Sequence, residues 1–171
     1  MMMEESRPLC WRQAEFGDLP AIDRVSRAIH VDLMERPEVF AEKLSLFARG
    51  CLILCEAGVI VGYGLSHPWR LYSIPPLDTL LGRLPNSPDC IFIHDVAVLT
   101  SARGRGSAGQ FVRKTFNFAC EQGISALALV SVYNTYPLWA QHGFEIITDF
   151  RVDEKLTSYG SSARYMIRKV D

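Results

Sequence analysis

Three glycines and two arginines lie within one short turn between residues 103 and 109. Glycine lets the backbone approach a ligand closely, and the first N–H groups of a helix have no partner within that helix. The helix dipole adds positive potential at the same place. A turn of this kind in front of a helix therefore predicts an anion site, and a pyrophosphate is the ligand that best fits it.

The segments on either side of the turn are the elements that must position it. Upstream, the apolar run 90–98 is rich in β-branched residues and predicts a buried strand. Downstream, apolar side chains recur at helical spacing and predict a helix with one face on that strand. These side chains are Ala108, Phe111, Val112, Thr115, Phe116 and Ala119.

Three motifs compete for this turn, and two of them fail. A nucleotide-binding P-loop needs Gly-Lys-Ser/Thr at the helix start, whereas Ser107 and Ala108 follow Gly106 here. The dinucleotide fingerprint G-x-G-x-x-G is present, with Gly104 and Gly109 as its outer glycines. Its context is wrong, because a five-residue spacer follows the strand and the next strand does not end in an acidic residue.

The third pattern is Arg/Gln-x-x-Gly-x-Gly/Ala, filled by Arg103, Gly106 and Ala108 beyond a Val-Ala-Val strand end. It resembles motif A of the GNAT superfamily, the acyl-CoA-dependent N-acetyltransferases. A second block, residues 133–144, is similar to the short helix ending in Gly-Phe that follows the next strand in that family. The resemblance covers most of the chain in element order, with its motifs within about residues 92–146.

The resemblance implies that acetyl-CoA is the co-substrate and that its pyrophosphate lies on the backbone amides of the turn. The central strand and its parallel neighbour would splay apart, and the pantetheine arm would pair with the free strand edge. A backbone N–H near Val98 would donate to the thioester oxygen as it gains charge. The implied cofactor-binding residues are Val96, Ala97, Val98, Arg103, Gly104, Arg105, Gly106, Ser107, Ala108, Gly109 and Asn134, the last with helix capping as an equal alternative.

The acceptor is expected to be the amine of a small molecule, which must lose a proton before it attacks. His94 is the candidate base, because its ordinary pKa lies near neutral pH and it precedes the cofactor-pairing segment. Its position corresponds to a catalytic histidine of the similar arylalkylamine N-acetyltransferase branch, whose Pro-Phe-Tyr also resembles residues 137–139. A buried structural histidine is the alternative. His94 and Asp95 are expected on opposite faces of the strand.

Many members of the family protonate the leaving thiolate from a tyrosine in the short helix. Trp139 occupies that position here, and an indole N–H is no practical acid. Tyr136 and Tyr133 are the candidate replacements, with water as the other proton donor. The missing tyrosine keeps open a CoA-binding module without catalysis, and acetylation of a protein N-terminus or lysine is a third possibility. The remaining histidines have no partner that can be identified from the sequence and are expected to be structural or exposed: His30, His67 and His142.

Length, charge and cysteine content limit which other kinds of protein this chain can be. With 171 residues and a formal net charge of −1, the chain is predicted to be one domain, 1–171, that binds no nucleic acid. Residues 1–6 lack the basic and apolar parts of a signal peptide, and no apolar run is long enough to cross a membrane. Five scattered cysteines favour buried, reduced thiols in a cytoplasmic protein without a metal site. Dimers are common among such folds, so a homodimer is one expected assembly.

Periodicity and turn residues predict a mixed α/β fold around the central strand. Further strands are expected at 8–14, 51–55, 59–63, 124–131, 144–152 and 164–170. Helices are expected after Asp18, from Pro37 and over 133–142. The middle strand–helix–strand is a parallel right-handed crossover in a mostly antiparallel sheet, which also resembles the GNAT fold. Residues 67–88 are expected to form a loop that either walls an acceptor pocket or covers the sheet edge.

Overall fold

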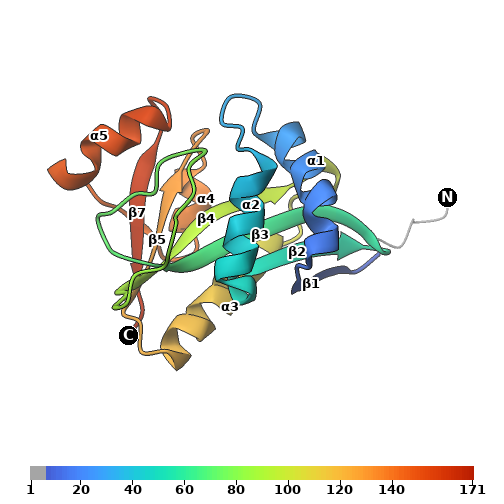
Figure 1. Ribbon diagram of the computed structural model, residues 1–171, viewed down its shortest axis with the longest axis horizontal. Helices are drawn as coiled ribbons and strands as arrows, with labels where there is room; N and C mark the ends of the chain where they lie inside the picture. Colours follow the sequence, from blue (N-terminus) through green and yellow to red (C-terminus); the bar gives the residue numbers. More distant parts are fainter. Residues whose placement is uncertain (1–6) are drawn as a thin grey trace.

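The computed structural model describes residues 7–171, which form a mixed sheet of seven strands in the order β1-β2-β3-β4-β5-β7-β6 (Figure 1). The strands are β1 (Leu9–Gln13), β2 (Cys51–Glu56), β3 (Val59–Trp69), β4 (Cys90–Val98), β5 (Ala126–Ser131), β6 (Glu145–Ile146) and β7 (Arg164–Lys169). Among the strand pairs within residues 7–171, only β4–β5 is parallel. The predicted mixed, mostly antiparallel sheet with one parallel crossover is confirmed. Residues 1–6, for which the sequence predicts no signal peptide, lie outside the described part.

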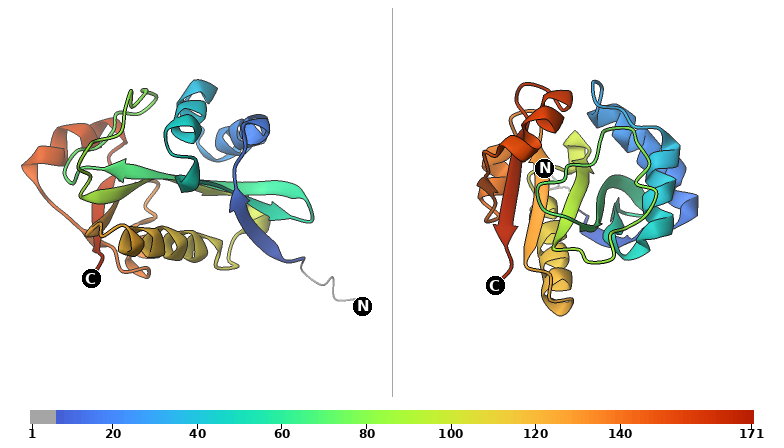
Figure 2. Two further views of the ribbon diagram at one scale, coloured as in Figure 1. Left: turned by 60° about the horizontal axis from the view of Figure 1, so that its bottom comes forward. Right: turned by 60° about the vertical axis from the view of Figure 1, so that its left-hand side comes forward.

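Helices cover both faces of this sheet. They are α1 (Leu19–Ile29), α2 (Pro37–Leu46), α3 (Ser107–Glu121), α4 (Tyr136–Ala140) and α5 (Phe150–Ser158). Figure 2 shows α1 and α2 on one face and α3 on the other. Pro20 and Pro37 lie in the first turns of α1 and α2, where a missing backbone N–H breaks no helical hydrogen bond.

β4 lies between two packed layers, because successive side chains of a strand point to opposite faces. Ile91 and Ile93 pack on the side of α3. Cys90 and Phe92 pack on the other side, in a cluster that includes residues of α5. The buried Tyr63 of β3 belongs to a third cluster, which includes residues of α1 and α2. The central strand is therefore covered on both faces, as its continuous apolar sequence indicates.

The prediction of a strand over 144–152 is wrong. Only Glu145–Ile146 pairs with β7, and α5 begins at Phe150. The side chain of Asp149 accepts a hydrogen bond from the backbone N–H of Arg151 at 2.9 Å, a helix N-cap that starts a new helix. Phe144, Ile146, Phe150 and Val152 all lie at even positions and so mimic the two-residue period of a strand.

The five thiols are free, and only Cys51 and Cys90 are buried. The expectation of buried thiols is wrong for Cys10 and Cys120, which are exposed. Across residues 7–171, no helix combines the length and the apolar character that a membrane span requires.

Gly64 of β3 lies against the ring of Phe111 of α3. A Cβ built on Gly64 would lie 2.3 Å from a ring carbon of Phe111, which is fully buried. Gly64→Ala is therefore expected to lower the free energy of unfolding by about 1–3 kcal/mol, the usual cost of overpacking. Urea unfolding measures the change. Gly17→Ala, whose new Cβ would meet nothing within 4 Å, is the control; equal stability of both variants would contradict the prediction.

Candidate active site

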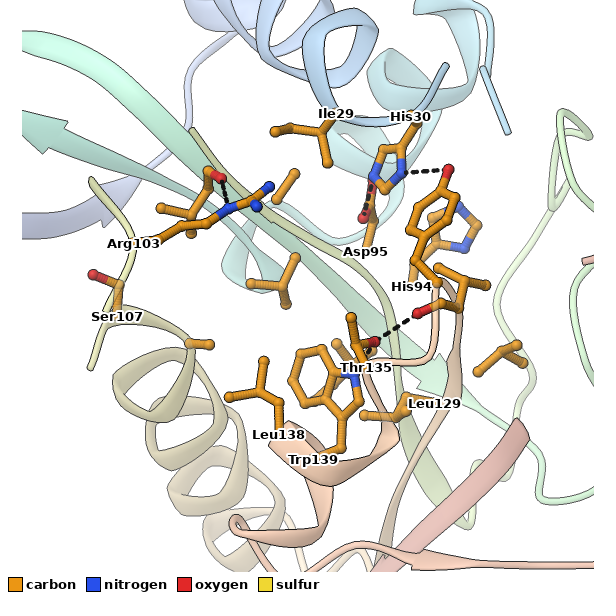
Figure 3. A pocket seen from close by; sticks show the side chains of 18 of the residues that line it. Ile29, His30, His94, Asp95, Arg103, Ser107, Leu129, Thr135, Leu138 and Trp139 are labelled. Atoms are coloured by element: carbon orange, nitrogen blue, oxygen red, sulfur yellow. Dashed lines mark hydrogen bonds and ion pairs between the residues drawn. The ribbon is translucent and has the colours of Figure 1, made fainter. Parts of the chain in front are cut away.

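A cavity of about 640 Å³ lies where β4 and β5 part. The two strands pair only over residues 91–93 and 127–129, although β4 continues to Val98 and β5 to Ser131. Side chains from both faces of the sheet reach this cavity, and the first turn of α3 lies at one end of it (Figure 3). The gap is thus a lined cavity in the middle of the sheet, at the place where the resemblance to the GNAT superfamily implies splayed strands.

The end of the cavity next to α3 presents hydrogen-bond donors. Gly104 and Gly106 adopt positive φ values of 74° and 79°, which glycine accepts without strain and which turn the chain into α3. No side chain among the described residues caps the helix, so its first N–H groups are free. Ser107 Oγ is buried there without a hydrogen-bond partner in the described part of the chain. An anion with several oxygens would satisfy these donors.

Nine of the eleven predicted cofactor-binding residues line the cavity: Val96, Ala97, Val98, Arg103, Gly104, Gly106, Ser107, Ala108 and Gly109. Arg105 does not, because its guanidinium pairs with Glu56 at 2.6 Å and with the carbonyl of Arg7. Asn134 is exposed and lies outside the lining. It does not cap α4 either, whose N-cap residue is Thr135.

The edge of β4 that faces the gap carries a free donor. Leu99 donates its backbone N–H to Val61 of β3 at 2.8 Å. Because successive N–H groups of a strand point to opposite edges, the N–H of Val98 faces the gap. The carbonyl of Val98 lies on the same edge and accepts a hydrogen bond from Arg103 Nε at 2.9 Å. This edge can therefore pair with an extended ligand.

A β-bulge at His94 reshapes the other end of the cavity. Asp95 pairs with Leu65 and Ile93 with the next residue of β3, so His94 is an extra residue in β4. Bulges redirect side chains. His94 and Asp95 both reach partners in residues 30–36, the α1–α2 segment that joins the two helices, and the expectation that they point to opposite faces is wrong.

His94 is buried against a carboxylate. Its Nε2 lies 2.7 Å from Glu35 Oε1, and the other oxygen of Glu35 accepts the backbone N–H of Asp78 at 2.9 Å. Burial alone would raise the pKa of Glu35, but His94, Lys43 and the Asp78 N–H lower it to about 2. A carboxylate at this distance holds the proton on Nε2 and leaves Nδ1 as the acceptor. Nδ1 has no partner among residues 7–171.

A second imidazole–carboxylate pair lies beside the first. His30, at the end of α1, places Nε2 2.9 Å from Asp95 Oδ1, while the Tyr63 hydroxyl donates to Asp95 Oδ2 at 2.5 Å. His30 Nδ1 lies 3.4 Å from the hydroxyl of Tyr133 (Figure 3). Burial lowers the pKa of His30, but the charge of Asp95 and the hydrogen bond to it outweigh burial and hold the pKa above its ordinary value.

The candidate tyrosines differ in position. Tyr133 lines the cavity and its hydroxyl faces His30, whereas Tyr136 is exposed outside the lining. The indole N–H of Trp139 donates to Thr135 Oγ1 at 3.2 Å. Of the aromatic side chains near α4, only Tyr133 brings a hydroxyl into the described cavity.

Sequence reasoning missed Glu35 and the role of His30. Glu35 lies between two predicted helices and His30 directly after one, so neither carries a local pattern of chemistry. Their partners are 59 and 65 residues away in the sequence. The only available signal is that both polar residues lie beside apolar helix faces, which a single sequence does not distinguish from ordinary surface residues.

The contact of the Glu35 carboxylate with His94 is expected to make stability depend on pH. The pKa of Glu35 falls from 4.5 to about 2 on folding, so its contribution is present above pH 4.5 and is lost as pH falls toward 2. Glu35→Gln is expected to lower the free energy of unfolding at pH 7 by about 1–3 kcal/mol, and by less at pH 3. Urea unfolding at the two pH values measures this. The exposed Glu38→Gln is the control; a pH-independent loss would contradict the assignment.

Solved structures of other proteins share this fold. The structure matches Ard1 from Thermoplasma volcanium with a TM-score of 0.73 and 15% identity over 95% of this chain and 98% of that one. It also matches N-acetylglutamate synthase from Neisseria gonorrhoeae, which was solved with coenzyme A and N-acetyl-glutamate. The TM-score is 0.72 and the sequence identity 21%, and the match covers 98% of this chain and 36% of that one.

A third structure is the ribosomal-protein-S18-alanine N-acetyltransferase from Escherichia coli, at a TM-score of 0.68 and 14% identity over 96% and 95%. At these identities the likenesses show the fold. None of the curated proteins matches the sequence. The model of the acetyltransferase (GNAT) family matches residues 13–144, which is more than half of the chain. The protein therefore belongs to the acetyltransferase (GNAT) family.

Proposed function

We propose that this chain transfers the acetyl group of acetyl-CoA directly to the amine of a small molecule, as one acetyltransferase domain, 1–171, in the cytoplasm. The observation that carries the proposal is the cavity between the parted strands β4 and β5. It has anion donors at the end formed by α3 and two imidazole–carboxylate pairs at the other. A phosphate-bearing acyl donor and a protonated acceptor would each meet the chemistry they need.

The residues at the α3 end fit the donor. Free helix N–H groups, the unpartnered Ser107 Oγ and the exposed Arg103 would bind the pyrophosphate. The edge of β4 from Val96 to Val98 would pair with the pantetheine arm, and the Val98 N–H would donate to the thioester oxygen as it gains charge. Acetyl-CoA supplies the activated acyl group.

His94 would act as the general base of the transfer. Glu35 holds the proton on its Nε2, so Nδ1 takes the proton from the amine nitrogen and the imidazolium that forms faces a carboxylate. The C–N bond forms, the C–S bond breaks, and the sulfur keeps the electron pair. Tyr133 or water would return a proton to that sulfur. Direct transfer is favoured because no cysteine or serine lies beside a base in the motif.

Loop 70–89 is fixed in place beside the end of the cavity that holds the two histidines, and this arrangement favours a small acceptor. Arg36 pairs with Asp78, and the carboxylate of Glu42 accepts the backbone N–H groups of residues 81 and 82 at 2.6 and 2.8 Å. The Tyr159 hydroxyl donates to the carbonyl of Pro75 at 2.5 Å. Loop 70–89 is thereby tied to the segment between α1 and α2, to α2 itself and to the residue that follows α5. An open groove for an extended peptide would need these contacts to break.

Loop 70–89 has residues in the places that both predicted roles would need. Leu77 lines the cavity, whereas Trp69 and Tyr72 pack on the core at the sheet edge. Trp69 itself belongs to β3, which includes the first three residues of the predicted loop. The similarity to the arylalkylamine branch, which rests on His94 and residues 137–139, directs the proposal toward apolar small amines.

The test is a thiol-release assay with acetyl-CoA against arylalkylamines, polyamines, amino acids and short peptides. Release that depends on an amine, with the acetylated amine identified by mass spectrometry, supports the proposal. Saturable CoA binding without any amine-dependent release indicates a CoA-binding module instead. Turnover with peptides alone indicates a protein acceptor.

A further inference from the structure

We propose that His30, held by Asp95, is a second proton acceptor of this site, which takes the first proton from the protonated acceptor amine and releases it to solvent. This inference rests on the proposed acetyl transfer. It assigns a role to the residue directly after α1, which lies 64 positions before His94 in the chain.

The reaction removes two protons from the acceptor nitrogen, and each needs a path away from it. An alkylammonium ion carries three protons on nitrogen, and the amide product carries one. One proton must leave before attack to free the nitrogen lone pair, and the second leaves as the C–N bond forms. Of these two protons, one ends on the CoA sulfur and the other goes to solvent. A single imidazole accepts only one proton at a time.

The two imidazoles are placed for these two steps. Each pair joins the α1–α2 segment to β4. In one pair the segment provides the histidine, His30, which contacts Asp95, and in the other it provides the carboxylate, Glu35, which contacts His94. Both histidines line the same cavity. In each pair the carboxylate lies against Nε2, so the same tautomer leaves Nδ1 as the proton acceptor in both rings.

The two histidines differ in their access to water. The side chain of His94 is 2% exposed and that of His30 is 11% exposed. His30 Nδ1 faces the hydroxyl of Tyr133, which is 42% exposed at the rim of the cavity. Burial, Asp32 and Asp95 raise the pKa of Tyr133, which therefore stays a neutral hydroxyl. A proton on His30 has a route to solvent along this hydroxyl, whereas the ring of His94 is almost completely buried.

The charges around His30 favour its protonated form. Asp95 of β4 contacts it directly, Glu35 of the α1–α2 segment acts on it through space, and Tyr133 faces its other nitrogen. The hydroxyl of Tyr63 in β3 donates a hydrogen bond to Asp95. Tyr63 keeps its proton, because burial and the charge of Asp95 raise the pKa of Tyr63. An imidazole in this setting can hold a proton taken from an ammonium ion until water removes it.

The competing role is a purely structural link between α1 and β4, and His30→Gln separates the two. A glutamine amide can still donate to Asp95 but accepts no proton from an amine. In the thiol-release assay we expect kcat/KM to fall about 10- to 100-fold at pH 7. The loss should shrink as the pH approaches the pKa of the amine, where the neutral amine is abundant. The Kd for acetyl-CoA and the melting temperature should match the wild type.

Asp95→Asn tests the positioning role and His94→Gln is the matched comparison. Without the Asp95 charge, the acidic limb of the kcat/KM profile should move to lower pH, whereas His94→Gln should slow the reaction at every pH. An active wild type with an unchanged His30→Gln profile would overturn this inference and leave the acetyltransferase standing. A wild type that binds CoA but acetylates no amine would overturn the proposed function and this inference with it. A loss that is the same at every pH would assign His30 a structural role.

Discussion

His94→Ala is expected to lower kcat by about 100- to 1,000-fold, the usual contribution of a positioned general base. The Kd for acetyl-CoA should stay within about twofold, because the donors at the α3 end and the β4 edge belong to the backbone and to other residues. Steady-state thiol release measures the rate, and calorimetry with acetyl-CoA measures binding. Rates equal to those of the wild type across the pH range would exclude His94 as the base.

His94→Ala is also expected to lower stability, so the loss of activity needs a control for folding. Alanine leaves the buried Glu35 carboxylate without its imidazole partner, and a buried unpaired charge is destabilising. His94→Gln keeps a donor near Glu35 but supplies no base of comparable strength. If His94 acts as a base, both variants lose activity, whereas only the alanine variant melts at a clearly lower temperature. If His94 is only structural, the glutamine variant keeps its activity.

The local parts of this site could be predicted because their signals are local. The apolar run 90–98 is a strand with those bounds, and the spacing of apolar residues after the turn forms α3. Nine of the residues predicted from the glycine turn and the strand end line one cavity, since strand, turn and helix follow one another directly in the chain. Short sequence separation fixes their relative positions.

The acceptor end could not be predicted in the same way, because it depends on contacts between distant segments. A strand sequence by itself places His94 and Asp95 on opposite faces, and only the register against β3 creates the bulge that brings them to one side. Arg105 illustrates the same limit at the other end. Its charge and position suit a phosphate, but Glu56, which is 49 residues away, pairs with it.

A carboxylate introduced at the start of α3 is expected to have opposite effects on folding and on binding. Ala108 lies in the first turn of α3 and lines the cavity. Ala108→Asp places a negative charge near the positive end of the helix dipole, where it stabilises a helix by about 0.3–1 kcal/mol. The same charge would repel a pyrophosphate held by these N–H groups, so the Kd for CoA should rise about 10- to 100-fold, by the cost of a like charge at short range.

Ala108→Asn separates the charge from the size of the new side chain, and it should weaken CoA binding far less. Calorimetry at low and high salt checks the electrostatic origin, since screening should reduce the difference between the Asp and Asn variants. Acetyl-pantetheine, which lacks the pyrophosphate, should be used equally well by both variants in the thiol-release assay. Equal CoA affinity of the Asp variant and the wild type would mean that the pyrophosphate does not lie on the N-terminus of α3.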